Sequence, residues 1–336
     1  MYQDDGSSSA TSSPLQFFSM MSLSPGVGSP YPWVRELKSE ERGLYLIHLL
    51  LTCANHVASG SLENAEIALG QISHLASPDG DTMQRIAAYF SEALAHRIIK
   101  AWPGVSRALN ATRLTLVSEE IMVRKLFYEM FPFLKVAYVL TNQAIIEAME
   151  GEKMVHIIDL HAAEPAQWIA LLQSLSARPE GPPHLRITGI HQQKEVLDQM
   201  AHRLIEEAEK LDIPFQFNPI VSKLENLDME KLRVKTGEAL AISSVLQLHP
   251  FLAPELLEKN MVNGYSRSPD SASSSPLSSP ASVKMDYLLN TLWSLSPKLV
   301  VVTEQDSNHN GLTLMERLSE ALYSYAALFD CLESTV

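Results

Sequence analysis

The chain changes its hydrophobic period at residue 154, and this change restricts the fold more than any other feature. Before it, apolar residues recur every three or four positions; after it, short β-branched runs alternate with helical segments. The runs are MVHIIDL (154–160), HLRITGIH (184–191), PFQFNPIV (214–221), ALAISSVLQLH (239–249) and KLVVVTEQD (298–306). Because strands joined by helices need right-handed crossovers, they form a parallel sheet covered on both faces. The sequence predicts an α/β fold: a helical cap module packed on a doubly wound Rossmann-like (methyltransferase-like) sheet, with strand order three-two-one-four-five.

The segment from 39 to 150 predicts the helical cap. Its apolar stripes include Leu62, Ala65, Leu69, Ile72 and Ala76. A later helical stretch, 123–149, is interrupted by Pro132. Stripes of this kind are typical of an ordinary core. A coiled-coil dimer seam is the alternative, which the shortness of the repeats disfavours.

Two Ser-rich tracts, 1–30 and 263–284, carry too few large apolar side chains to repay the entropy of ordering. We expect a disordered leader at 1–30 and a disordered insertion at 263–284. The insertion then divides one domain over 31–336, with the first part of the α/β core at 151–262 and its continuation at 285–336. The Ser-Pro pairs of the insertion are typical of turns, and phosphorylation is the alternative interpretation.

Charge and composition exclude several classes of function. The 336 residues include 26 basic and 39 acidic side chains, a net charge of −13, which disfavours direct binding to nucleic acid by the bulk surface. Only two cysteines occur, so a disulfide framework is excluded and a reducing compartment is expected. The most apolar run, 44–58, is too short to span a membrane and contains polar residues, so we expect no membrane contact.

Polar residues follow the predicted strands, at the sheet edge where ligands bind in this fold class. They are Asp159, His161, His191, His249, Glu304, Gln305 and Asp306. Their convergence would suit a metal or acid–base site. The alternative is that each ends its strand independently, and we favour it because no pair has the i, i+4 spacing of helical metal ligands. His156, inside the first strand, is expected to be a core histidine.

The first strand-to-helix turn argues against a nucleotide or S-adenosylmethionine site. Such turns need glycines, so that the backbone approaches the ligand closely. Here the turn is LHAAEP (160–165), in which no glycine occurs and Glu164 places a negative charge where a phosphate would lie. No Walker-type loop or GxSxG elbow occurs. We therefore expect no catalytic residue, cofactor or metal.

Several motifs resemble the plant GRAS family of transcriptional regulators. VHIID, formed by Val155, His156, Ile157, Ile158 and Asp159, matches the defining pentapeptide of the family. LLTCANHV (50–57) resembles its first leucine-rich region, and 213–248 resembles the second, running toward the PFYRE region. Against that pattern, His161 stands where Asp is expected. The chain also stops at Val336, early in PFYRE (285–336) and before the SAW region, so we expect an incomplete GRAS domain with its C-terminal strands missing.

The resemblance implies a nuclear, non-enzymatic co-regulator in gibberellin signalling and root development. Its implied partners are DELLA proteins, INDETERMINATE-domain zinc-finger transcription factors and other GRAS proteins, with DNA reached only indirectly. The negative charge suits a partner with a basic zinc-finger surface. The alternative function is a small-molecule binding protein, for S-adenosylmethionine or a hormone, or a methyltransferase-like enzyme.

A candidate partner-binding motif lies in the first leucine-rich stretch. Leu46, Leu49 and Leu50 form an LxxLL pattern, which on a helix presents one apolar strip to a groove. Because neighbouring positions are also apolar, burial in the core of the cap is the alternative, and the pattern favours it.

Overall fold

The computed structural model describes residues 38–100, 102–112, 117–252 and 280–335. The predicted leader lies outside these residues, and so do positions 263–279 of the predicted insertion. The rest of that insertion was predicted wrongly, because residues 280–284 form the start of helix α10 (Pro280–Ser294), with proline at the first helical position. In the described part of the chain, no helix has both the length and the apolar character needed to cross a bilayer.

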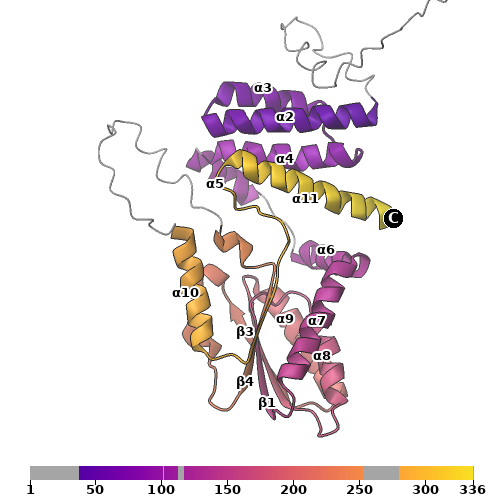
Figure 1. Cartoon of the computed structure of the whole chain (residues 1–336), viewed down its shortest axis with the longest axis vertical. Helices are drawn as coiled ribbons and strands as arrows, with labels where there is room; N and C mark the ends of the chain where they lie inside the picture. Colours follow the sequence, from indigo (N-terminus) through magenta and orange to yellow (C-terminus); the bar gives the residue numbers. More distant parts are fainter. Residues whose placement is uncertain (1–37, 101, 113–116, 253–279, 336) are drawn as a thin grey trace, which may run out of the picture.

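Five parallel strands form the sheet at the lower half of Figure 1. They are β1 (Met154–Asp159), β2 (His184–His191), β3 (Phe215–Val221), β4 (Ala239–Val245) and β5 (Leu299–Thr303). Their spatial order is β3-β2-β1-β4-β5, which confirms the predicted order. The order reverses between β1 and β4, so the motif-bearing strand lies at the topological switch point.

Helices cover both faces of this sheet, as a doubly wound fold requires. Three of them, α7 (Pro132–Ala148), α8 (Ala166–Ser176) and α9 (Lys194–Lys210), share one apolar core with the sheet face that carries Val155 and Ile157. Helix α10 packs on the opposite face, which carries Ile158. Both cores depend on the period-two alternation of β1, because successive side chains of a strand point to opposite faces.

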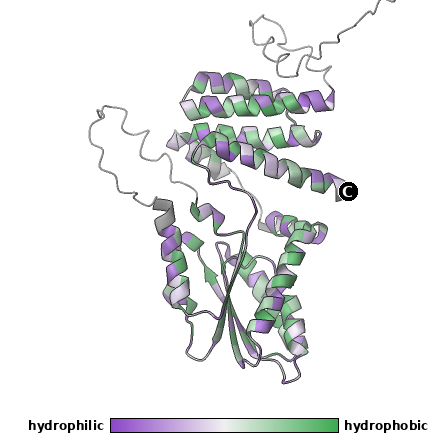
Figure 2. Cartoon of the chain, viewed as in Figure 1, coloured by the Kyte–Doolittle hydropathy of each residue, from purple (hydrophilic) through white to green (hydrophobic). Residues whose placement is uncertain are grey.

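A second unit, the helical cap, lies above the sheet in Figure 1. It contains α2 (Ser39–Ser59), α3 (Leu62–Ser73), α4 (Thr82–Ile99) and α5 (Pro103–Thr112), and the far end of the sequence adds α11 (Leu314–Thr335). Leu318 and Leu322 of α11 are buried in the cap core. Figure 2 shows the alternating hydrophobic and hydrophilic faces of these helices. The sequence boundary at 150 is therefore not the boundary between the cores, since α7 packs on the sheet and α11 on the cap.

The helix break predicted at Pro132 is confirmed. Helix α6 (Val117–Met130) ends two residues earlier, and α7 begins at the proline, whose missing N–H costs nothing in a first turn. The fourth strand is shorter than predicted. It ends at Val245 because Leu246 adopts a left-handed conformation (φ 55°), and His249 then begins a 3-10 helix (His249–Leu252).

Candidate functional site

The VHIID residues lie at the centre of the sheet and are all buried. Strand β1 pairs with β2 on one side and with β4 on the other, so its backbone donors and acceptors are used on both sides. No side chain of the five is more than 4% exposed. The motif therefore shapes the interior, and a partner would contact it only through the residues around it.

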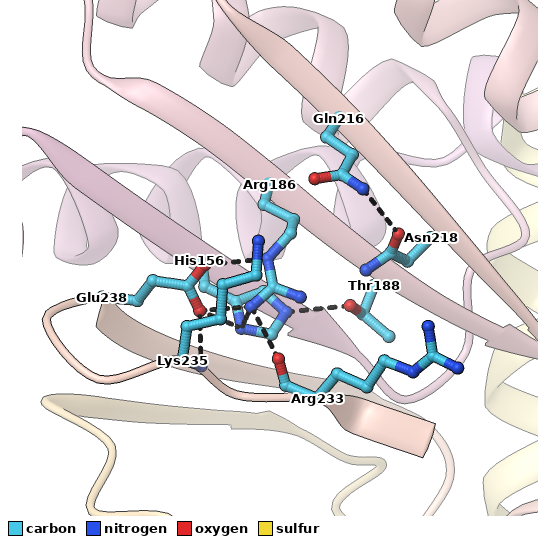
Figure 3. Close-up of polar contacts among 8 residues, drawn as sticks. All are labelled: His156, Arg186, Thr188, Gln216, Asn218, Arg233, Lys235 and Glu238. Carbon is cyan, nitrogen blue, oxygen red and sulfur yellow. Dashed lines mark hydrogen bonds and ion pairs between the residues drawn. The ribbon is translucent and has the colours of Figure 1, made fainter. Parts of the chain in front are cut away.

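His156 holds a buried polar network between β1, β2 and the residues before β4 (Figure 3). Its Nε2 lies 2.8 Å from the Thr188 hydroxyl, and Arg186 donates to its Nδ1 at 3.0 Å. Arg186 also forms a two-pronged ion pair with Glu238, with one bond of 3.0 Å from Nε, and donates to the backbone oxygen of Arg233 at 3.0 Å. The amide of Lys235 donates to Glu238 at 3.0 Å. The network thus fastens the loop before β4 to the sheet.

This network is built around a neutral histidine. Because arginine can only donate, Nδ1 of His156 accepts, and the ring proton lies on Nε2. Burial and the Arg186 charge lower the pKa of His156 to about 4. Burial opposes ionisation of Glu238, but hydrogen bonds from Arg186 and the Lys235 amide hold its pKa below the usual value. The charge of Arg186 is therefore compensated by Glu238 and not by the ring.

Asp159, the last motif residue, joins the end of β1 to helix α8. Its carboxylate accepts the indole N–H of Trp168 at 2.8 Å and the amide of His161 at 2.9 Å. Burial raises the pKa of Asp159 to about 6, against the effect of these two bonds. Trp168 is fully buried, so its N–H needs such an acceptor. Asp159 thereby fixes the direction in which the chain leaves the sheet.

A second polar cluster, the edge cluster, lies at the carboxyl ends of β1 and β2. It consists of Glu120 and Arg124 from α6, His161, His191 and Gln193. Arg124 donates to Nε2 of His161 at 2.7 Å and to Glu120 at 2.6 Å, and the two histidine rings are 5.0 Å apart. Burial, followed by the charge of Arg124, lowers the pKa of His161 to about 3. The cluster is therefore a pair of neutral imidazoles beside an arginine.

A pocket of about 190 Å³ adjoins the edge cluster, lined by His161, His191, Lys223, Gln247 and Phe251 among others. The amide of Gln193 donates to Nδ1 of His191 at 3.1 Å, so the ring proton is on Nε2. That Nε2 is buried and has no hydrogen-bond partner in the structure. The pocket is smaller than the ~300–1,000 Å³ that organic ligands usually occupy.

The polar residues predicted at the strand ends form more than one group. Asp159, His161 and His191 come together, whereas His249 pairs with Glu304 at 2.9 Å on the β4–β5 side. Gln305 contacts His309, and Asp306 is exposed. Within the ranges that the structure describes, no group of three or more His, Cys, Asp or Glu side chains is arranged to hold a metal ion.

The turn after β1 packs tightly against β2 through the side chain of Ala162. Ala162 donates its amide to the Ile190 carbonyl at 3.0 Å and packs over β2 at Gly189. A Cβ atom at Gly189 would lie 2.7 Å from the Ala162 Cβ and 2.7 Å from the Phe217 ring. The glycine that permits close packing is thus on β2, and the packed group is this chain's own turn. At this point the turn contacts β2 directly, through Ala162 and Gly189.

The three leucines of the LxxLL pattern lie inside the cap. Leu46 and Leu50 are fully buried and Leu49 is 4% exposed, all in the core shared with α3, α4 and α11. This is the core arrangement that the sequence left open as the alternative. A partner would reach these side chains only if the cap opened, so their role in partner binding stays a prediction.

Sequence reasoning missed the residues that hold the motif in place, Arg186, Thr188, Glu238, Glu120 and Arg124. One signal was available, because a charged residue within the apolar run HLRITGIH requires a buried counter-charge. Neither Glu238 nor α6 could be identified as the partner, since both are distant in the sequence.

The comparisons with known proteins agree with this geometry. The family model described as the GRAS domain family matches residues 46–336. The chain belongs to the GRAS family. This membership supports a role as a plant transcriptional regulator.

The matches to relatives extend over most or all of the chain. It is 65% identical to Scarecrow-like protein 3 of Arabidopsis thaliana, over 100% of this chain and 78% of that protein. It is 53% identical to GRAS family protein TF80 of Medicago truncatula, over 92% of this chain and 76% of that protein. A crystal structure of SCL7 from Oryza sativa matches with a TM-score of 0.63 and 27% identity, covering 87% of this chain and 71% of that one. The α/β fold with its parallel sheet is thus that of a solved GRAS protein.

Proposed function

We propose that this chain acts without catalysis, as a nuclear co-regulator that binds DELLA proteins and INDETERMINATE-domain zinc-finger transcription factors in gibberellin signalling and root development. The observation that carries the proposal is the tightly packed turn after β1 in a chain of the GRAS family. Ala162 packs against Gly189 where the turn after β1 meets β2, and a fold of this class can serve through its surfaces as a binder of other macromolecules.

Charge supports the choice of partner. At −13, the chain is repelled by a phosphate backbone and attracted to a basic surface such as that of a zinc-finger protein. Relatives at 34% and 32% identity are DELLA protein 1 of Medicago truncatula and DELLA protein GAI1 of Vitis vinifera. DELLA partners would thus share the fold of this chain, so binding to them, and to other GRAS proteins, would join two similar folds.

A quantitative pull-down tests the proposal. The purified chain is immobilised and offered DELLA and INDETERMINATE-domain proteins separately, with bovine serum albumin as the negative control. We expect retention of both, and weaker retention of the zinc-finger protein at high salt because its contact is electrostatic. Retention of neither would contradict the proposal.

A small-molecule site at the strand ends is the second candidate, favoured by the unpartnered Nε2 of His191 and the adjoining pocket. Calorimetric titration with S-adenosylmethionine, nicotinamide cofactors and gibberellins separates it from the first. Micromolar binding that Lys223→Gln weakens would favour this candidate over a scaffold alone. Absence of heat with all three would leave the scaffold function as the better account.

A further inference from the structure

A groove lies between α4 and α11 on the surface of the cap. None of its lining residues belongs to the VHIID motif. Its volume is about 630 Å³. The two helices are far apart in the sequence and lie next to each other in Figure 1. Apolar side chains from both helices line the groove, among them Phe90, Leu94, Leu314 and Leu318.

The shape of the groove suits an α-helix. On α4 and its C-cap residue, the lining residues recur at three- and four-residue spacing from Tyr89 to Lys100, and on α11 from Leu314 to Ala321. At 1.5 Å per residue the α4 wall is about 16 Å long, which is three helical turns. A groove with two helical walls and apolar side chains along it is the arrangement that receives the apolar face of an amphipathic helix.

The charge of the groove is opposite to that of the chain. Arg97, Lys100 and Arg317 line it, against the single carboxylate of Glu92. Arg97 makes no ion pair or hydrogen bond with any residue that the structure describes, and Arg317 donates only to the backbone oxygens of Gly311 (2.6 Å) and Leu312 (3.1 Å). Burial and the charge of Arg317 lower the pKa of Arg97. Among the described residues, no carboxylate forms an ion pair with either guanidinium group, and Arg97 is half-buried.

We propose that this groove binds a short amphipathic helix of a partner protein, whose apolar face lies between α4 and α11 and whose acidic side chains pair with Arg97 and Arg317. The inference rests on the proposed function only in taking the chain to be a protein-binding scaffold. It adds the surface and the chemistry of the bound segment. Carboxylates on the partner would supply the bidentate acceptors that arginine prefers.

Fluorescence anisotropy with the labelled peptide Ac-EELLEELLEELL-NH2 tests the inference on the full chain at low salt. We expect micromolar binding that weakens roughly tenfold in Arg97→Gln and in Arg317→Gln, as for the loss of a charge-assisted contact. Lys194→Gln removes one exposed cation from α9, far along the chain, and controls for the change in net charge. Its affinity should equal that of the unaltered chain.

A second pair of variants tests the groove without changing charge. Ala321→Trp fills the groove, whereas Ala327→Trp places the same ring on an exposed position of the same helix. We expect the first to abolish peptide binding and the second to leave it unchanged, with circular dichroism melts checking that both variants fold.

Three outcomes would overturn the inference: no binding at about millimolar peptide, binding that ignores both arginine substitutions, or binding that survives Ala321→Trp. Displacement of the peptide by decanoate at lower concentration than by unlabelled peptide would also overturn it, because the site would then be one for small acids. The pull-down described above is read separately. If the peptide assays contradict the groove inference, retention of DELLA and INDETERMINATE-domain proteins in the pull-down still supports the proposed function.

Discussion

The network around His156 and the edge cluster around His161 contain the same kinds of residue. They differ in how completely their polar atoms are hydrogen-bonded and shielded from solvent. In both, burial and an adjacent arginine keep an imidazole neutral. Around His156 both ring nitrogens have partners and Arg186 is 3% exposed. In the edge cluster Nε2 of His191 has no partner, and the side chain of Arg124 is 30% exposed. A lowered histidine pKa therefore indicates burial beside a cation, and only a ring nitrogen without a hydrogen-bond partner, next to a pocket, makes the site a candidate for binding.

Removing the carboxylate of the closed network should have the largest effect. Glu238→Ala leaves Arg186 buried with only neutral partners, and we expect a loss of about 3–5 kcal/mol in the free energy of unfolding. Urea denaturation measures it. Glu333→Ala, which removes the half-exposed partner of Arg85, is the matched control and should change little. Equal losses in the two variants would mean that the His156 network is not a closed, buried unit.

The pH dependence of stability tests next whether His156 is neutral in the folded state. His156 has a folded pKa of about 4 against 6.5 unfolded, so the unfolded state takes up its proton first and the contribution of His156 to stability falls as the pH drops from 6.5 to 4. In His156→Gln that part of the loss, about 3 kcal/mol, should vanish. Denaturant unfolding at several pH values gives the slopes. A variant slope equal to that of the unaltered chain would contradict the assigned neutral ring.

The next largest change in stability is expected from a substitution at Gly189, beneath the edge cluster. Gly189→Ala places a Cβ against Ala162 and Phe217, and we expect destabilisation of about 1–3 kcal/mol from overpacking. Gly70→Ala in α3 is the control, because nothing lies within 4 Å of its Cβ position, and it should stabilise the helix by about 0.5–1 kcal/mol. Thermal melts compare them. A neutral Gly189→Ala would show that the turn after β1 is loose enough to admit a ligand.

Removing the arginine of the edge cluster should lower the free energy of unfolding least. Arg124→Gln removes a half-exposed cation, so the change in stability should stay below about 1 kcal/mol. The pKa of His161 should rise from about 3 and stay below 6.5, because burial, the larger cause of its lowering, remains. NMR titration of the ring resonances follows it. An unchanged pKa would show that Arg124 and His161 do not interact in solution.

Periodicity predicted the sheet and its order because strand and helix patterns are local properties of the sequence. The VHIID strand, the break at Pro132 and the order around β1 followed from that information. The pairing of Arg186 with Glu238, 52 residues apart, did not, because it depends on how the strands align. The end of β4 at Leu246 was also missed, since leucine gives no sequence signal of a left-handed conformation. In the candidate site, sequence indicated the chemistry of the strand ends and not which of them meet.

The return of α11 to the cap has a consequence for how the protein is made. Helices α2, α3 and α4 leave the ribosome before the sheet, yet Leu318 and Leu322 complete their core only when the last described helix has been synthesised. Until then the nascent cap exposes an apolar surface for the time taken to translate the whole sheet, at about 5–20 residues per second. Chaperone dependence during synthesis should therefore be concentrated on these cap helices, which wait for α11.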